Sequence, residues 1–181
     1  LLADHIKHKP DPVTIWCSAA STGEEPYSIA MTLLETLGPK ASQAKVIATD
    51  IDTEALAKAR KGIYPQEQVR KLDEARVKRF FQKGTGNHIG LARVRPEVSA
   101  LVEFMPLNLL APQWPVKGPF DAVFCRNIMI YFDKDTQAKI LKRFAPLMKP
   151  DGLLFAGHSE NFSYISDAFK LRGQTVYTLA K

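Results

Sequence analysis

The chain has 181 residues, of which 45% are hydrophobic and 24% are charged. These proportions are ordinary for a globular domain and exclude a disordered or collagen-like protein. The length is sufficient for one domain whose core needs no disulfides. The 25 basic and 19 acidic side chains give a formal net charge of +6, which suits an acidic partner without choosing between a protein, a nucleic acid and a membrane surface.

Neither a membrane anchor nor a disulfide framework is predicted. No apolar run approaches the roughly 18 residues that a membrane span needs, and the first residues do not form a signal peptide. Cys17 and Cys125 each lie inside an apolar run, so we interpret them as small buried hydrophobic residues. The four histidines lack metal-ligand spacing, and no metal site is predicted. The sequence indicates a cytoplasmic protein that does not insert into a membrane.

Strands alternate with amphipathic helices along most of the chain, a pattern typical of a parallel α/β sheet. The strands are short apolar runs, as expected when helices cover both faces of the sheet. The predicted parallel strands lie at 13–18, 45–50, 101–108, 120–127 and 153–156, followed by a hairpin at 169–179. The predicted fold class is therefore α/β, a doubly wound and mostly parallel sheet with an antiparallel C-terminal hairpin.

One region breaks the alternation of strands and helices. Residues 66–81 form a predicted charged helical segment, and residues 83–103 contain three closely spaced glycines among short β-prone pieces. Such spacing favours tight hairpins over a helix. We therefore predict a small antiparallel β-subdomain at 83–103, inserted into a domain that spans 1–181.

The loop after the first strand carries helix-start signals and two carboxylates. Ser21 with Glu24, or Thr22 with Glu25, fits a capping box. Only Gly23 is a glycine, so the loop lacks the G-x-G-x-x-G pattern of dinucleotide sites. The two glutamates would repel a diphosphate and attract a cation, which favours S-adenosylmethionine, a sulfonium and ammonium compound without phosphate. The alternative is that both glutamates only stabilise the start of the helix.

Asp50 follows the second strand, where an acidic side chain can bind both hydroxyls of a ribose. Asp52 and Thr53 are better placed to cap the next helix, so the ribose role is favoured for Asp50. Asn108 follows the third strand and could hydrogen-bond an adenine edge or serve as a turn residue. The sequence alone leaves these two roles of Asn108 open.

A second polar cluster follows the fourth strand. Arg126 could hold a carboxylate through two hydrogen bonds, and Tyr131 could position a substrate oxygen near a reactive methyl group. The alternative for Tyr131 is a half-buried core aromatic with its hydroxyl in solvent, which is the commoner role of a single tyrosine.

Together these residues resemble the chemotaxis receptor methyltransferase family, CheR. The matching segments are 18–28, 48–52, 124–132 and 157–160, and the most specific parts are Thr-Gly-Glu-Glu-Pro-Tyr-Ser and Cys-Arg-Asn-x-x-x-Tyr-Phe. The resemblance implies a class I S-adenosylmethionine-dependent methyltransferase fold. It implies methyl esterification of glutamates on the cytoplasmic helices of bacterial chemoreceptors, with S-adenosylhomocysteine as the product. Family members usually carry an N-terminal helical domain, so we expect a catalytic-domain fragment.

The resemblance also implies roles for individual residues. The expected cofactor contacts are Glu24 at the methionine end, Asp50 at the ribose, Asn108 and Leu109 at the adenine, and Arg126 and Asn127 along the site. Arg126 and Tyr131 are the expected catalytic residues, with Tyr131 near the transferring methyl group. A glutamate carboxylate is already ionised at neutral pH, so this methyl transfer needs no general base.

Some family members dock a short peptide from the receptor's carboxyl terminus on the inserted subdomain by strand addition. Residues 91–95 predict a strand with Arg93 and Arg95 on one face, suited to an acidic peptide. The alternative is that these arginines only protect an edge strand from aggregation. We expect a monomer that binds receptor methylation helices and, by this route, the receptor tail.

Two other function classes stay open. A non-catalytic module that senses S-adenosylmethionine or S-adenosylhomocysteine would use the same binding residues. A nucleic-acid methyltransferase would draw on the positive charge, but basic and aromatic residues are not interleaved. The Asn-Pro-Pro-Tyr type of motif is also replaced by Asn127-Ile128-Met129-Ile130, so no nucleic-acid partner is expected.

Overall fold

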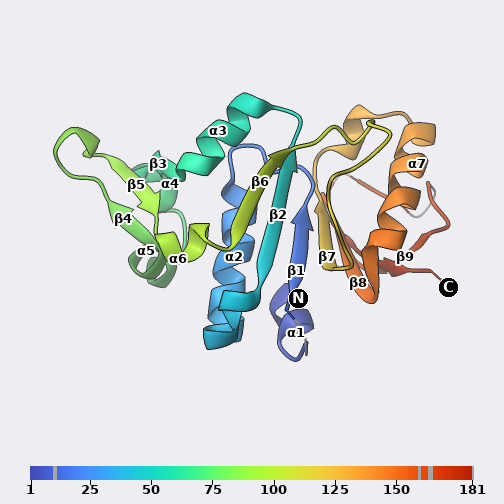
Figure 1. Cartoon of the computed structure of the whole chain (residues 1–181), viewed down its shortest axis with the longest axis horizontal. Helices are drawn as coiled ribbons and strands as arrows, with labels where there is room; N and C mark the ends of the chain where they lie inside the picture. The colour runs from blue at the N-terminus through green and yellow to red at the C-terminus, as the bar shows by residue number, and fades with distance from the viewer. Residues whose placement is uncertain (10–11, 159, 163–164, 181) are drawn as a thin grey trace.

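Figure 1 shows a computed structural model of the chain, which describes residues 1–9, 12–158, 160–162 and 165–180. Ser159, which belongs to the matching segment 157–160, lies outside the described residues. Within them a seven-stranded main sheet has the spatial order β6 (Val102–Pro106), β2 (Lys45–Asp50), β1 (Thr14–Cys17), β7 (Phe120–Cys125), β8 (Met148–Ala156), β10 (Val176–Leu179) and β9 (Phe169–Gly173).

The main sheet is parallel from β6 to β8 and antiparallel at its other end. β1 pairs parallel with both β2 and β7, β2 pairs parallel with β6, and β7 pairs parallel with β8. β10 pairs antiparallel with β8 and β9. The predicted sheet with its antiparallel C-terminal hairpin is confirmed.

Helices cover both faces of the main sheet (Figure 1). Alternate residues of β1 enter two separate cores: Ile15 packs with α2 (Glu24–Leu37) and α3 (Thr53–Lys61), whereas Trp16 packs with α7 (Lys134–Phe144). Both side chains are 0% exposed. The continuous apolar run of β1 is the consequence of this burial on both faces.

The shorter helical elements lie before β1 or between the strands. They are α1 (Leu2–Ile6), α6 (Pro96–Ser99), and the 3-10 helices η1 (Gly38–Gln43), η2 (Gly86–His88), η3 (Met129–Tyr131) and η4 (Ala145–Leu147). Among the helices of the described residues, none has the length and apolar character that a membrane crossing requires.

The helix starts were predicted with mixed success. Asp52 is the N-cap of α3 and accepts hydrogen bonds from the backbone N–H groups of the next turn, as predicted. The capping boxes predicted for α2 are wrong, because its N-cap is Gly23, with φ 100° and no side-chain cap. A Cβ atom on Gly23 would lie 2.9 Å from both Ala59 Cβ and the Tyr64 hydroxyl oxygen. Close packing against α3 and a positive φ therefore require glycine at this position.

The inserted subdomain begins before the range 83–103 in which it was expected. Its three-stranded antiparallel sheet has β5 (Leu91–Val94) between β3 (Ile63–Pro65) and β4 (Phe81–Lys83). Helices α4 (Gln66–Val69) and α5 (Glu74–Phe80) connect β3 to β4. At the other boundary, the chain from Val102 onward belongs to β6 of the main sheet.

The two ends of this insert meet. The backbone N–H of Val94 donates a hydrogen bond to the carbonyl of Gly62 at 2.9 Å. Figure 1 shows the small sheet standing beside α2 and α3, away from the C-terminal half of the main sheet. One contact ties it to the loop before α2, where the Tyr64 hydroxyl donates to the Thr22 carbonyl at 2.7 Å.

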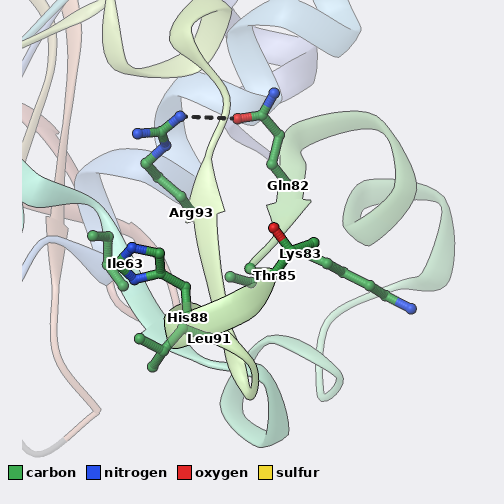
Figure 2. A pocket seen from close by; sticks show the side chains of 9 residues that line it. Ile63, Gln82, Lys83, Thr85, His88, Leu91 and Arg93 are labelled. Carbon is green, nitrogen blue, oxygen red and sulfur yellow. Dashed lines mark hydrogen bonds between the residues drawn. The ribbon is translucent and has the colours of Figure 1, made fainter.

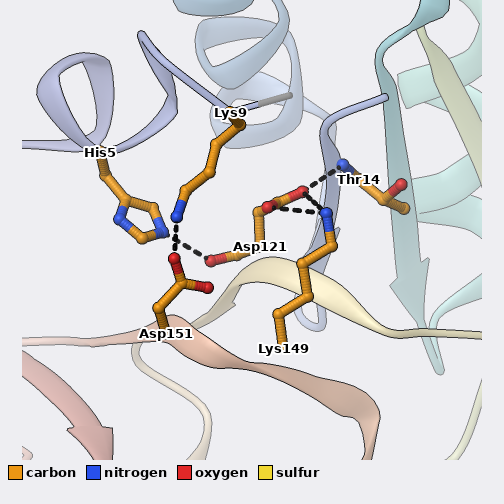
Figure 3. A network of polar contacts seen from close by, with 6 residues as sticks. All are labelled: His5, Lys9, Thr14, Asp121, Lys149 and Asp151. Atoms are coloured by element: carbon orange, nitrogen blue, oxygen red, sulfur yellow. Dashed lines mark hydrogen bonds and ion pairs between the residues drawn. The ribbon is translucent and has the colours of Figure 1, made fainter. Parts of the chain in front are cut away.

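A polar network fastens α1 to the amino-terminal edge of the main sheet (Figure 3). Asp121, near the start of β7, is 0% exposed. Its carboxylate accepts hydrogen bonds from the Thr14 backbone N–H at 2.9 Å and from Lys149 Nζ at 2.9 Å. The Asp121 carbonyl is 3.0 Å from His5 Nε2. This network lies at the opposite end of the strands from the predicted polar site.

Candidate functional site

Adjacent parallel strands bring the predicted polar residues to the carboxyl edge of the main sheet. The last residues of β1, β2 and β7 are Cys17, Asp50 and Cys125, and their following loops carry the polar groups. The loops after β1 and β2 are in direct contact, because Asp50 Oδ2 accepts a hydrogen bond from the Ser21 backbone N–H at 2.8 Å. In parallel α/β sheets this edge is where ligands bind.

The Asp50 carboxylate can accept further hydrogen bonds. Besides Ser21, its carboxylate accepts one hydrogen bond from the Asp52 backbone N–H, at 2.9 Å. A carboxylate offers about four acceptor positions, so two further positions can receive hydroxyl groups. The half-buried Asp50 side chain therefore has the chemistry to bind the two hydroxyls of a ribose.

The two glutamates at the start of α2 have different surroundings. Glu25 is half-buried, accepts a hydrogen bond from Cys17 Sγ at 3.1 Å and lies 3.4 Å from Arg126 Nη1. Glu24 is exposed, and its carboxylate accepts a hydrogen bond from Gln68 Nε2 of α4 at 3.2 Å. Glu25 thus lies at the carboxyl edge of the main sheet, whereas Glu24 contacts the inserted subdomain. This differs from the expectation that Glu24 belongs to the site.

Burial shifts the pKa of three groups at the sheet edge. It raises the pKa of Glu25 above its ordinary value, while the Cys17 hydrogen bond and the Arg126 charge lower it. Burial also raises the pKa of the Cys17 and Cys125 thiols. Both thiols are 0% exposed, which confirms their interpretation as buried hydrophobic residues.

The loop after β7 holds the Arg126 side chain at the sheet edge and leaves the Tyr131 side chain in solvent. Arg126 is half-buried beside Glu25, and Asn127 adopts a positive φ of 60°. Tyr131, in η3, is 79% exposed. The alternative interpretation of Tyr131 as a half-buried core aromatic is therefore wrong, and its hydroxyl is accessible to a bound substrate.

The loop after β6 holds Asn108 in a turn and Leu109 in the core. Asn108 is exposed and its Oδ1 accepts a hydrogen bond from the Leu110 backbone N–H at 2.9 Å, so its turn role is confirmed. Leu109 is 5% exposed and packs in the hydrophobic core. The adenine roles of Asn108 and Leu109 stay predictions.

Sequence reasoning missed two apolar side chains at this edge. Ile51 directly follows Asp50 and is 63% exposed, and Leu110 is 57% exposed. Exposed apolar residues beside a few convergent polar groups are typical of small-molecule sites. The sequence feature that could have revealed them is a large apolar residue at or near the end of a strand, close to a polar residue.

Arg93 and Arg95 lie in the inserted subdomain, away from the sheet edge. Arg93 is on β5, donates a hydrogen bond to Gln82 Oε1 at 3.2 Å and lines a cavity of about 230 Å³ that also contains His88 and Lys83 (Figure 2). Arg95 follows β5 and lines a different cavity, of about 270 Å³. The two arginines thus line different cavities, and their shared face stays a prediction. The edge-strand alternative is wrong, because β5 pairs on both sides.

The polar groups at the sheet edge fit S-adenosylmethionine. Glu25 offers a carboxylate to an ammonium group, Asp50 offers acceptors to ribose hydroxyls, and no glycine-rich phosphate loop is present. In the part of the chain that the structure describes, no group of three or more His, Cys, Asp or Glu side chains could hold a metal ion.

Curated relatives match the whole chain. It is 61% identical over 181 residues to the chemotaxis protein methyltransferase of Escherichia coli (strain K12), covering 100% of this chain and 63% of that protein. It is 53% identical over 183 residues to chemotaxis protein methyltransferase 2 of Pseudomonas aeruginosa, covering 99% of this chain and 65% of that protein. The chain thus spans less than two thirds of the length of these relatives.

Solved structures support the fold. The chain is similar to the CcbJ methyltransferase from Streptomyces caelestis, with a TM-score of 0.50 and 16% identity over 86% of this chain and 48% of that one. It is also similar to a pericyclic reaction enzyme, with a TM-score of 0.55 and 14% identity over 95% of this chain and 44% of that one. Residues 1–178 match the family described as "CheR methyltransferase, SAM binding domain". The chain therefore belongs to the CheR methyltransferase family and contains its S-adenosylmethionine-binding domain.

Proposed function

We propose that the chain transfers a methyl group from S-adenosylmethionine to glutamate side chains on the cytoplasmic helices of chemoreceptors. The observation that carries this proposal is the pair of carboxylates, Glu25 and Asp50, at the carboxyl edge of a parallel sheet with no phosphate loop. The curated relatives named chemotaxis protein methyltransferase support the same reaction class.

Four residues would hold the cofactor. Asp50 would accept hydrogen bonds from the ribose hydroxyls, and Glu25, rather than Glu24, would face the ammonium group. Arg126 would bind the carboxylate of the methionine part, since a guanidinium and a carboxylate form charge-assisted hydrogen bonds. Asn127, the next residue, would line the same part of the site. When bound, S-adenosylmethionine supplies a methyl group on a cationic sulfur.

The protein's task in the transfer is alignment. The glutamate of the receptor is ionised at neutral pH, so no residue has to remove a proton. Tyr131 is exposed beside the site and would donate a hydrogen bond that orients the incoming carboxylate. Correct orientation of the two reacting groups is itself a large part of the rate acceleration.

We also propose that the inserted subdomain docks an acidic peptide from the receptor tail. Strand addition requires an unpaired edge, and β4 is an edge strand with two cavities beside it. Lys83 at the end of β4 lines both cavities, Arg93 lines one and Arg95 the other. A peptide strand beside β4 would send alternate side chains toward the two arginines.

Calorimetric titration of the chain with S-adenosylhomocysteine tests the cofactor site. We expect binding by the parent, a loss of at least about tenfold in affinity for Asp50→Ala, and parental affinity for Asp52→Ala, which removes only the cap of α3. No binding by a folded parent would contradict the proposal. Methyl transfer to a receptor fragment then separates an enzyme from a non-catalytic sensing module, which would bind without turnover.

A further inference from the structure

A buried carboxylate joins the loop after β8 to the loop after β7. Glu160 is 7% exposed. Its Oε1 accepts hydrogen bonds from the backbone N–H groups of Asn127 and Gly157, both at 2.8 Å. Its Oε2 accepts a hydrogen bond from the Met129 backbone N–H, also at 2.8 Å. Three backbone N–H groups from two loops therefore converge on one side chain, and hydrogen bonds to an ionised acceptor are among the strong ones.

The segment that Glu160 holds contains an uncommon backbone conformation. Asn127 has φ 60°, a left-handed conformation that is uncommon outside glycine and that asparagine adopts more readily than most other residues. Its N–H bond to Glu160 helps to hold this conformation. The neighbouring Met129 is held at both backbone polar groups, because its N–H donates to Glu160 and its carbonyl accepts a hydrogen bond from Gln137 Nε2 at 2.7 Å.

Close packing leaves this arrangement little room to shift. A Cβ atom on Gly157 would lie 2.5 Å from Asn127 Oδ1 and 2.9 Å from Glu160 Oε1. On the other side, Gln137 of α7 also donates to the Phe132 carbonyl at 2.8 Å. Segment 126–131 is thus fixed between Glu160 and Gln137.

We propose that Glu160 is a positioning residue for methyl transfer, which fixes segment 126–131 so that Arg126 and Tyr131 keep their places at the sheet edge. This inference rests on the proposed function, which assigns those two residues their roles. Glu160 acts through the backbone of Asn127 and Met129 and touches neither reacting group. A displacement of a catalytic group by about 1 Å can cost about a hundredfold in rate.

The test compares Glu160→Gln with Asp121→Asn. The first change keeps the size of the side chain but turns one acceptor oxygen into an NH₂ group, which then faces a backbone N–H. The second makes the same change at another buried carboxylate, which is 0% exposed and bonds a backbone N–H at the opposite edge of the sheet. Both variants should lose stability, so a lower kcat in Glu160→Gln than in Asp121→Asn reports on positioning and not on stability.

We expect Glu160→Gln to lower kcat on a receptor fragment by about 10- to 100-fold, with KM for that fragment within about threefold. Backbone amide exchange at Asn127 and Met129 should become faster in the same variant. Asp121→Asn should keep kcat within about threefold of the parent at a temperature where both variants are folded, and leave exchange at these two amides unchanged.

Parental kcat and parental exchange rates in Glu160→Gln would overturn the inference, and so would an equal loss of kcat in Asp121→Asn. If Glu160→Gln does not fold, Gln137→Met tests the same segment from α7, and parental kcat in that variant overturns the inference. Failure of the proposed function is distinguishable, because the parent itself would then transfer no methyl group to the receptor fragment, while the exchange comparison still reports on segment 126–131.

Discussion

The Glu25 carboxylate, in the first turn of α2, lies 3.4 Å from the guanidinium of Arg126, in the loop after β7. This ion pair joins two loops that are about a hundred residues apart in the chain and places a carboxylate and a guanidinium side by side at the sheet edge. Glu24, one residue earlier, contacts Gln68 of α4 instead. The direction in which α2 begins decides which glutamate reaches the site.

Neutralising each glutamate in turn tests this assignment. Glu25→Gln removes the charge that would face the cofactor's ammonium group, and we expect the Kd for S-adenosylhomocysteine to rise about tenfold, or about 1.4 kcal/mol. Glu24→Gln makes the same chemical change on the exposed side and should alter the Kd by less than about twofold. Equal effects of the two changes in calorimetric titration would contradict the assignment of Glu25.

The ion pair at the other edge of the sheet should contribute to stability. Lys149→Met leaves the fully buried Asp121 without its cation, and we expect a loss of about 3 kcal/mol in the free energy of unfolding. The exposed pair of Lys45 and Glu103 has the same 2.9 Å separation. Lys45→Met should therefore cost less than about 1 kcal/mol. Urea denaturation of both variants measures the difference, and equal losses would refute the role of burial.

Stability should also fall in mild acid because of His5. Burial lowers the pKa of His5 below its ordinary value of 6.5, so below that pH the unfolded chain binds a proton that the folded chain resists. The contribution of neutral His5 is complete above pH 6.5 and decreases as the pH falls toward the folded-state pKa. The urea midpoint of the parent should drop between pH 7.5 and 5.0, and His5→Gln should reduce that drop. His8→Gln, at an exposed position, should leave the pH profile unchanged.

Charge reversal tests peptide docking on the inserted subdomain. Arg93→Glu should weaken binding of an acidic receptor-tail peptide about tenfold, because the arginine lines the cavity beside β4. Arg79→Glu changes the net charge equally at an exposed position on α5 and should have a smaller effect. A peptide Kd in Arg93→Glu that equals the parental value, measured by calorimetry, would remove the docking proposal.

The carboxyl edge of the main sheet was predictable, because residue type and strand order suffice to place Asp50 there. The position of Glu25 at this edge was not predictable. Successive helical residues differ by about 100° in direction, so the residue at which the helix begins decides whether Glu24 or Glu25 faces the site. That residue is Gly23, selected by close packing against Ala59 and Tyr64, which no local pattern reveals. Glu160 was missed for a related reason, because its three partners meet it only after β7 and β8 pair.

The inserted subdomain was predicted in kind but not in extent. Its first strand, Ile63–Pro65, has only three residues, which is too short for an alternating pattern to be recognised. The closely spaced glycines near β4 and β5 gave a stronger signal, so the expected range began too late. Pairing between β3 and β5, not local sequence, defines the start of the subdomain.

The hydrogen bond between Val94 and Gly62 closes the insert on itself, so the chain leaves the main domain and returns to it at nearly one point. When the two ends of an insert lie this close together, the free energy of folding depends only weakly on the length of the insert. The surface of residues 63–94 can therefore change in sequence and length while the main sheet keeps its strand order. Tyr64 is the exception that we expect to be retained, because its hydroxyl donates a hydrogen bond to the Thr22 carbonyl in the loop after β1.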